Sequence, residues 1–182
     1  MFQKLNVDIN VGNFSHGNKI TEYSYTVLND KSVPLIQYHV ALGECREKML
    51  QLLPERFRSA FVINIMNIAG IVVPHTDSNI RCTINHYVQT NDEETIFFAF
   101  KENAEGFQIT NQTNGRLFKL DEVNRVDSFI AKAGETWILD VTKPHGVKGQ
   151  MPIKDYRVAI VMNTNTYSYQ EVLEMLKETN SI

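Results

Sequence analysis

The feature that most constrains the fold of this chain is a succession of short apolar or alternating runs that are separated by turn residues. Runs of this kind, rich in β-branched and aromatic residues, are typical of β-strands. Strands are predicted at Lys4–Ile9, Tyr23–Leu28, Leu35–Ala41, Phe61–Ile68, Ile71–Asp77, Cys82–Val88, Thr95–Phe100, Arg116–Leu120, Thr136–Val141 and Tyr156–Asn163. Because only a short acidic loop separates Cys82–Val88 from Thr95–Phe100, we expect these two runs to be the arms of one hairpin.

Two segments have helical rather than alternating spacing. In Glu44–Leu53 the apolar residues recur at intervals of three and four, and Pro54 ends the run. Near the end of the chain, Ser168 and Glu171 form a capping-box pattern, and apolar residues follow on one side. Many short strands with one early and one late helix predict a mainly β fold, a sandwich or barrel of the jelly-roll type with a few flanking helices.

The composition is that of an ordinary globular protein. The 182 residues are 43% hydrophobic and 21% charged, which predicts one domain over residues 1–182. A net charge of −3 gives no reason to expect nucleic-acid binding. No signal-peptide pattern and no apolar run long enough for a membrane span is visible, and the two cysteines form no C-x-x-C motif. We therefore expect a cytoplasmic protein that binds neither nucleic acid nor membranes.

Three residues have the spacing of a metal site. His75 and Asp77 are two positions apart, and on a strand such residues face the same side, so both could reach one ion. His145 follows an apolar strand and lies between Pro144 and Gly146, where a ligand can project inward. Two imidazoles and one carboxylate make up the facial triad that suits non-haem Fe(II), because it leaves coordination positions open.

A fourth residue adds an anion-binding group. Arg157 lies 12 positions after His145 in an otherwise apolar strand, where a guanidinium is unfavourable unless it meets an anion such as a carboxylate. With His75, Asp77, His145 and Arg157 in this order, the chain resembles the 2-oxoglutarate- and Fe(II)-dependent oxygenases, and among them the prolyl and aspartyl hydroxylase-like branches. Their pattern is His-x-Asp, a distant His, and then Arg or Lys. The resemblance covers about residues 61–163.

The resemblance implies a fold, a cofactor and a reaction. The fold is a double-stranded β-helix, a jelly-roll or cupin-like barrel, with its core at about 61–163. By the same likeness His75, Asp77 and His145 are the catalytic metal centre and bind Fe(II), and Arg157 holds the distal carboxylate of the cosubstrate 2-oxoglutarate. The implied reaction uses O2 to hydroxylate a C–H bond and releases succinate and CO2.

Polar residues on the strand after His-x-Asp are a further point of resemblance. Alternation places Thr83, Asn85 and Tyr87 on one face of this strand and His86 on the other. We expect the first face to look into the barrel, with Asn85 and Tyr87 near the cosubstrate. Ala159 stands where many relatives have a serine whose hydroxyl shares the cosubstrate carboxylate, so either another hydroxyl such as that of Tyr87 takes this role or none does.

Two other classes of protein are compatible with the same residues. A cupin-like metalloenzyme could use the three ligands without 2-oxoglutarate, and a non-catalytic jelly roll could bind a ligand while His75 and Asp77 are incidental. In either case Arg157 could pair with Asp140 or Asp155 on the surface instead of meeting a cosubstrate.

Little chain remains outside the barrel. The expected substrate is therefore a small molecule, an amino acid or a peptidyl residue. Segments 16–21 and 101–115 are predicted to be loops that could cover the mouth of the barrel as lids.

Overall fold

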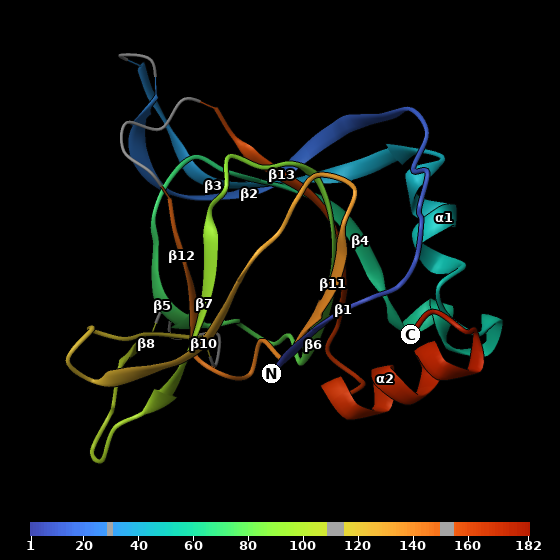
Figure 1. Cartoon of the computed structure of the whole chain (residues 1–182). Coiled ribbons are helices and arrows are strands. Elements are labelled where there is room, and N and C mark those ends of the chain that lie inside the picture. Colours follow the sequence, from blue (N-terminus) through green and yellow to red (C-terminus); the bar gives the residue numbers. More distant parts are fainter. Residues whose placement is uncertain (29–30, 109–114, 150–154) are drawn as a thin grey trace.

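The computed structural model describes residues 1–28, 31–108, 115–149 and 155–182, whose strands form two antiparallel sheets (Figure 1). Sheet A has seven strands in the order β1-β11-β6-β13-β4-β3-β2, and sheet B has six in the order β10-β7-β12-β5-β9-β8. The strands are β1 (Phe2–Lys4), β2 (Phe14–Leu28), β3 (Lys31–Gly43), β4 (Val62–Ile68), β5 (Val72–Thr76), β6 (Cys82–Gln89), β7 (Glu94–Phe100), β8 (Phe107–Gln108), β9 (Arg116–Leu117), β10 (Val123–Ile130), β11 (Thr136–Leu139), β12 (His145–Lys148) and β13 (Arg157–Thr164).

Eight of these strands have the connectivity of a double-stranded β-helix. Along the chain, β4 to β7 alternate between sheets A and B, and β10 to β13 alternate again, starting from sheet B. Within sheet A the four core strands have the order β11-β6-β13-β4, and within sheet B they have the order β10-β7-β12-β5. The predicted mainly β, jelly-roll barrel with a few flanking helices is therefore confirmed.

Helices flank sheet A on its outer face (Figure 1). Ile63 and Ile65 of β4 point to this side and share one buried cluster with Met49 and Leu176 from the helices. Met66 and Ile68 of β4 point to the other face of the sheet, which looks into the barrel. The helices are α1 (Cys45–Leu50), the short 3-10 helix η1 (Glu55–Ala60) and α2 (Tyr169–Glu178).

Both predicted helices are present. α1 begins one residue after Glu44 and ends at Leu50, so it is shorter than the predicted Glu44–Leu53. Before α2 the Ser168 hydroxyl accepts a hydrogen bond from the Glu171 amide, while the Glu171 side chain accepts one from the Ser168 amide, which confirms the capping box. None of the helices in the described ranges is long and apolar enough to cross a membrane.

The predicted hairpin of Cys82–Val88 with Thr95–Phe100 is wrong, although both strands exist. β6 lies in sheet A between β11 and β13, whereas β7 lies in sheet B between β10 and β12. The acidic loop between them therefore crosses from one sheet to the other. An alternating pattern predicts a strand and its two faces, but neither the pattern nor the turn indicates which neighbour the strand pairs with.

Other expectations change at the ends of the barrel. Of the first predicted strand, Lys4–Ile9, only Lys4 lies in a strand, because β1 ends there after pairing with β11. Residues 16–21, expected to be a lid, belong to β2 and pair with β3. Of the second expected lid, 101–115, the described part includes a turn and β8, and residues 109–114 lie outside the described residues.

Candidate metal and anion site

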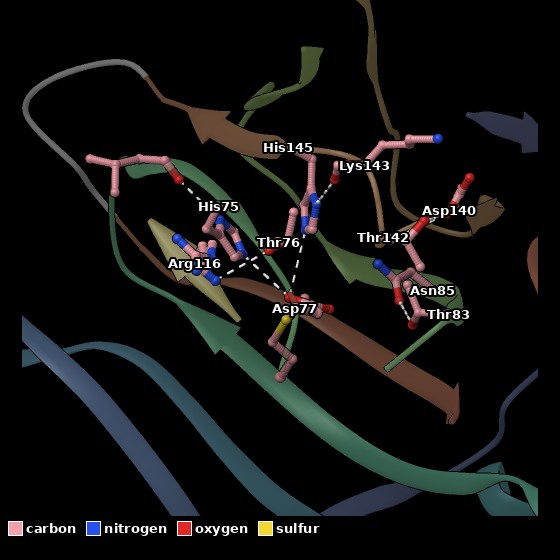
Figure 2. A network of polar contacts seen from close by, with 12 residues as sticks. His75, Thr76, Asp77, Thr83, Asn85, Arg116, Asp140, Thr142, Lys143 and His145 are labelled. Carbon is pink, nitrogen blue, oxygen red and sulfur yellow. Dashed lines mark hydrogen bonds and ion pairs between the residues drawn. The ribbon is translucent and has the colours of Figure 1, made fainter. Parts of the chain in front are cut away.

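Three side chains that could bind a metal ion meet where β5 and β12 pair in sheet B (Figure 2). His75 and His145 lie directly opposite each other in this antiparallel pair, and Asp77 comes immediately after β5. One ligand atom from each residue lies within 4.8 Å of the other two. The Oδ1 atom of Asp77 is 3.4 Å from Nε2 of His75 and 3.7 Å from Nε2 of His145. The structure thus brings together the three residues that the sequence singled out.

Backbone carbonyl groups orient both imidazole rings. Nδ1 of His75 lies 2.9 Å from the carbonyl oxygen of Val73, and Nδ1 of His145 lies 3.0 Å from that of Lys143. Since a carbonyl oxygen only accepts hydrogen bonds, Nδ1 carries the hydrogen in each neutral ring, and the lone pair of Nε2 points toward Asp77. This outer contact fixes the tautomer and the ring orientation that metal binding requires.

Gly146 allows β12 to approach β5 closely enough to form the site. A Cβ atom at position 146 would lie 2.7 Å from the carbonyl oxygen of Val72, so any side chain would force one of the two strands to move. With glycine there, the rings of His75 and His145 are held with their centroids 4.3 Å apart. The close approach of β5 therefore explains why a glycine follows His145 in the Pro-His-Gly segment, which the sequence alone did not reveal.

The three groups shift one another's pKa values. Burial, with the nearby His75 as the second cause, lowers the pKa of His145 to about 4. Burial opposes the ionisation of Asp77, but the hydrogen bond from His75 and the charge of His145 hold the pKa of Asp77 below its usual value. Burial likewise opposes protonation of His75, but Asp77 raises the pKa of that imidazole. At neutral pH the site offers an ionised carboxylate and a neutral His145, and a divalent cation would compete with a proton only at His75.

Arg157 is the anion-binding candidate, and it is buried at the start of β13 with an exposed fraction of 2%. One terminal nitrogen donates to the Thr95 hydroxyl at 2.8 Å, and the guanidinium carbon lies 4.5 Å from the ring centroid of Tyr87. The Nε atom has no hydrogen-bond partner among the described residues. Within the same residues, neither Asp140 nor Asp155 forms an ion pair with Arg157, so the surface pairing considered above is absent.

The three candidate metal ligands and the guanidinium of Arg157 line one cavity inside the barrel, together with apolar residues from both sheets. Thr83, Asn85 and Tyr87 also line it, whereas the ring of His86 faces the other side and its Nδ1 lies 2.9 Å from the Thr136 hydroxyl. The two faces of β6 are therefore oriented as expected. The side-chain amide of Asn85 lies between Thr83 and Tyr87. Its oxygen accepts a hydrogen bond from the Thr83 hydroxyl at 2.8 Å, and its nitrogen donates one to the Tyr87 hydroxyl at 3.4 Å.

Sequence reasoning missed three polar residues of this cavity, namely Thr95, Tyr38 and Asn163. Thr95 is the hydrogen-bond partner of Arg157, but threonine is a common strand residue and gives no signal of its own. Tyr38 reaches the cavity from β3, which precedes the barrel core, and its hydroxyl donates to Met66 Sδ at 3.3 Å. Burial and the charge of Asp77 raise the pKa of Tyr38 well above its usual range, so the phenol stays protonated.

Comparison with known proteins gives a structural likeness only. No family model and no curated protein matches the chain. Vicilin from hazelnut, Corylus avellana, is 7% identical over 71% of this chain and 28% of its own, with a TM-score of 0.39. Vicilin from Solanum melongena is 13% identical over 72% and 29%, with a TM-score of 0.41. The protein ycfD from E. coli is 12% identical over 76% and 36%, with a TM-score of 0.44.

The chain thus spans about a third of the length of each of these structures. Because the identities and TM-scores are low, the fold assignment rests on the strand connectivity of the chain itself. What the site does has to be inferred from its own residues.

Proposed function

We propose that the protein is a 2-oxoglutarate- and Fe(II)-dependent oxygenase that hydroxylates a C–H bond of its substrate. The observation that carries this proposal is the buried guanidinium of Arg157, which has no acidic partner in the described part of the chain and lines the same cavity as the three metal ligands. A cation in this position is costly to bury without an anion. A keto dicarboxylate supplies a carboxylate for the guanidinium at one end and metal-chelating oxygens at the other.

The donor set supports iron as the metal. Two imidazole nitrogens and one carboxylate oxygen are the ligands of non-haem Fe(II) centres, which keep positions free for a cosubstrate and dioxygen. A structural zinc site would normally have four protein ligands. Among the described residues, the only group of three or more His, Cys, Asp or Glu side chains with metal-binding spacing is His75, Asp77 and His145.

The residues around the cavity would hold the metal, anchor the cosubstrate and keep out water. When bound, the iron supplies the activation of O2 by which 2-oxoglutarate becomes succinate and CO2 and a substrate C–H becomes C–OH. Arg157 and the Thr95 hydroxyl would hold the distal carboxylate, and the stacked ring of Tyr87 keeps the guanidinium in place. Apolar side chains such as Leu139 and Val161 line the cavity and keep bulk water away from the reacting atoms.

Decarboxylation of 2-oxoglutarate tests this proposal without knowledge of the substrate. Fe(II)-loaded protein given 2-oxoglutarate in air, with ascorbate as the reductant in place of a substrate, should form succinate and CO2 slowly, and Asp77→Ala should lose both the metal and the turnover. Arg157→Met should keep the metal and lose most of the turnover. The matched control is Arg46→Met, which replaces an exposed arginine far from the cavity and should change neither.

Two results would contradict the proposal and point to the alternatives. Metal binding that depends on His75 and Asp77, without formation of succinate, would indicate a metalloenzyme that does not use 2-oxoglutarate. Absence of metal binding that depends on His75 and Asp77 would indicate a jelly roll that binds a ligand without catalysis.

A further inference from the structure

The part of the cavity beyond the triad is lined by amide and hydroxyl groups that the proposed chemistry does not use. Thr83 donates to the Asn85 side chain on β6, and Asn163 of β13 lies directly opposite Thr83. All three residues line the cavity. In Figure 2, Thr83 and Asn85 lie on the side of Asp77 away from His75. They form a hydrogen-bonding surface next to the metal site.

The part of this surface formed by Thr83 and Asn163 is too far from Arg157 to belong to the cosubstrate anchor, whereas Asn85 also contacts Tyr87, whose ring stacks on Arg157. Arg157 and Asn163 both line the cavity from β13 and are six positions apart, which corresponds to about 20 Å along a strand. A five-carbon dicarboxylate held by Arg157 is much shorter than this. The Asn163 amide has no hydrogen-bond partner within residues 1–28, 31–108, 115–149 and 155–182, so both its donor and its acceptor are available to a bound molecule.

A further hydroxyl comes from β3. Tyr38 lines the cavity and donates only to the thioether of Met66 at 3.3 Å, and a thioether sulfur is a weak acceptor. Its oxygen therefore keeps its capacity to accept a hydrogen bond from a bound molecule, and exchange of the sulfur for a stronger acceptor would be favourable.

Every charged side chain that lines the cavity already has a role in the proposed chemistry. Apart from tyrosines, its ionisable lining residues are His75, Asp77, His145 and Arg157. The first three are the metal ligands and the fourth is the anchor for the cosubstrate. A charged group on a substrate would lose its hydration without gaining a counter-ion, which is far more unfavourable than the loss of one hydrogen bond.

Exposed apolar side chains lie next to this surface. Val62 of β4 lies directly opposite Asn163 on the same face of sheet A, and it is 62% exposed. Val40 and Leu42 on the neighbouring β3 are exposed as well, and Val40 pairs with Asn64 of β4. The row from Thr83 through Asn163 to Val62 therefore changes from polar inside to apolar outside.

We propose that Thr83 and Asn163 form the substrate subsite, and that the group held there is uncharged, forms hydrogen bonds and is carried on an apolar body that rests on Val62. This inference rests on the proposed function and names its substrate class. A carboxamide or hydroxyl next to a methylene chain has this chemistry.

Binding of matched probes to protein loaded with Zn(II) and 2-oxoglutarate tests the subsite without turnover. The probes are the N-acetyl, C-methylamide forms of glutamine, glutamate, norleucine and lysine, and ligand-observed NMR measures their dissociation constants. We expect the glutamine probe to bind about tenfold more tightly than norleucine, and the two charged probes to bind more weakly than either. Asn163→Leu should lower the affinity for the glutamine probe to that for norleucine, whereas Asn124→Leu, at an exposed position of β10, should change nothing.

A charge introduced at the same position gives an independent check. Asn163→Asp should shift the preference toward the lysine probe, and this variant keeps the test valid if Asn163→Leu does not fold. The proposal is overturned if a charged probe binds wild-type protein as tightly as glutamine does, if both Asn163 variants leave the ranking unchanged, or if no neutral probe binds at millimolar concentration. Failure of 2-oxoglutarate to bind the Zn(II) protein would count against the proposed function instead, and the probe series without it would still test the subsite.

Discussion

Replacement of Arg157 by methionine has opposite consequences for stability and for ligand binding. Removal of a desolvated cation relieves several kcal/mol. Against this, the variant loses a stacking contact with Tyr87 that is worth about 2 kcal/mol when desolvated, and a charge-assisted hydrogen bond to Thr95 worth about 1.5–3 kcal/mol. Since methionine fills much of the same apolar space, we expect the ligand-free Arg157→Met protein to be as stable as wild type or more stable by about 1–3 kcal/mol.

The same variant should no longer respond to 2-oxoglutarate. At a concentration one hundred times its dissociation constant, the cosubstrate should raise the unfolding free energy of wild-type protein by about 2.7 kcal/mol and that of Arg157→Met by close to zero. Urea denaturation of the Zn(II)-loaded proteins, with and without 2-oxoglutarate, measures both effects. A loss of about 3 kcal/mol or more in the ligand-free variant would refute the reasoning, because it would show that the guanidinium is already satisfied within the fold.

Three further predictions concern the candidate metal site and its surroundings. In metal-free protein the unfolding free energy should be largest near pH 6.5. Toward lower pH the unfolded state protonates His145 while the folded state does not, so the protein loses up to about 3 kcal/mol of stability. Toward higher pH the folded state loses the stabilising proton on His75. Urea titrations at about pH 5, 6.5 and 8 would show it, and a flat profile would contradict it. Gly146→Ala should destabilise the protein by about 1–3 kcal/mol and weaken Zn(II) binding, because β5 and β12 must separate; unchanged Zn(II) affinity by calorimetry would argue otherwise. Thr95→Val should lower ligand-free stability by about 1–3 kcal/mol and 2-oxoglutarate affinity about tenfold, and equal affinities would exclude this hydroxyl from the anchor.

The candidate metal ligands could be predicted from the sequence because the geometry of His75 and Asp77 is local. His75 and Asp77 share one side of a strand region by alternation alone, and His145 needed only to lie on a neighbouring strand. The inward face of β6 followed from the same rule. Short-range periodicity is sufficient wherever a residue's direction is set by its own strand.

Features that depend on the partner of a strand could not be predicted in this way. The assignment of β6 and β7 to different sheets is decided by packing across the whole barrel. β10 went unrecognised because many of its side chains are exposed and polar, and β12 because it has only four residues. Thr95 and Tyr38 became visible as cavity residues only once the strands that carry them were placed around the site.

The measurement that tests the central claim most directly is an anaerobic titration of the Fe(II)-loaded protein with 2-oxoglutarate. We predict that a metal-to-ligand charge-transfer band appears in the visible spectrum, saturates at one equivalent per iron, and is lost or strongly weakened in Arg157→Met while the iron remains bound. Bound iron with no visible band at saturating 2-oxoglutarate would contradict the assignment of this barrel as a 2-oxoglutarate-dependent oxygenase.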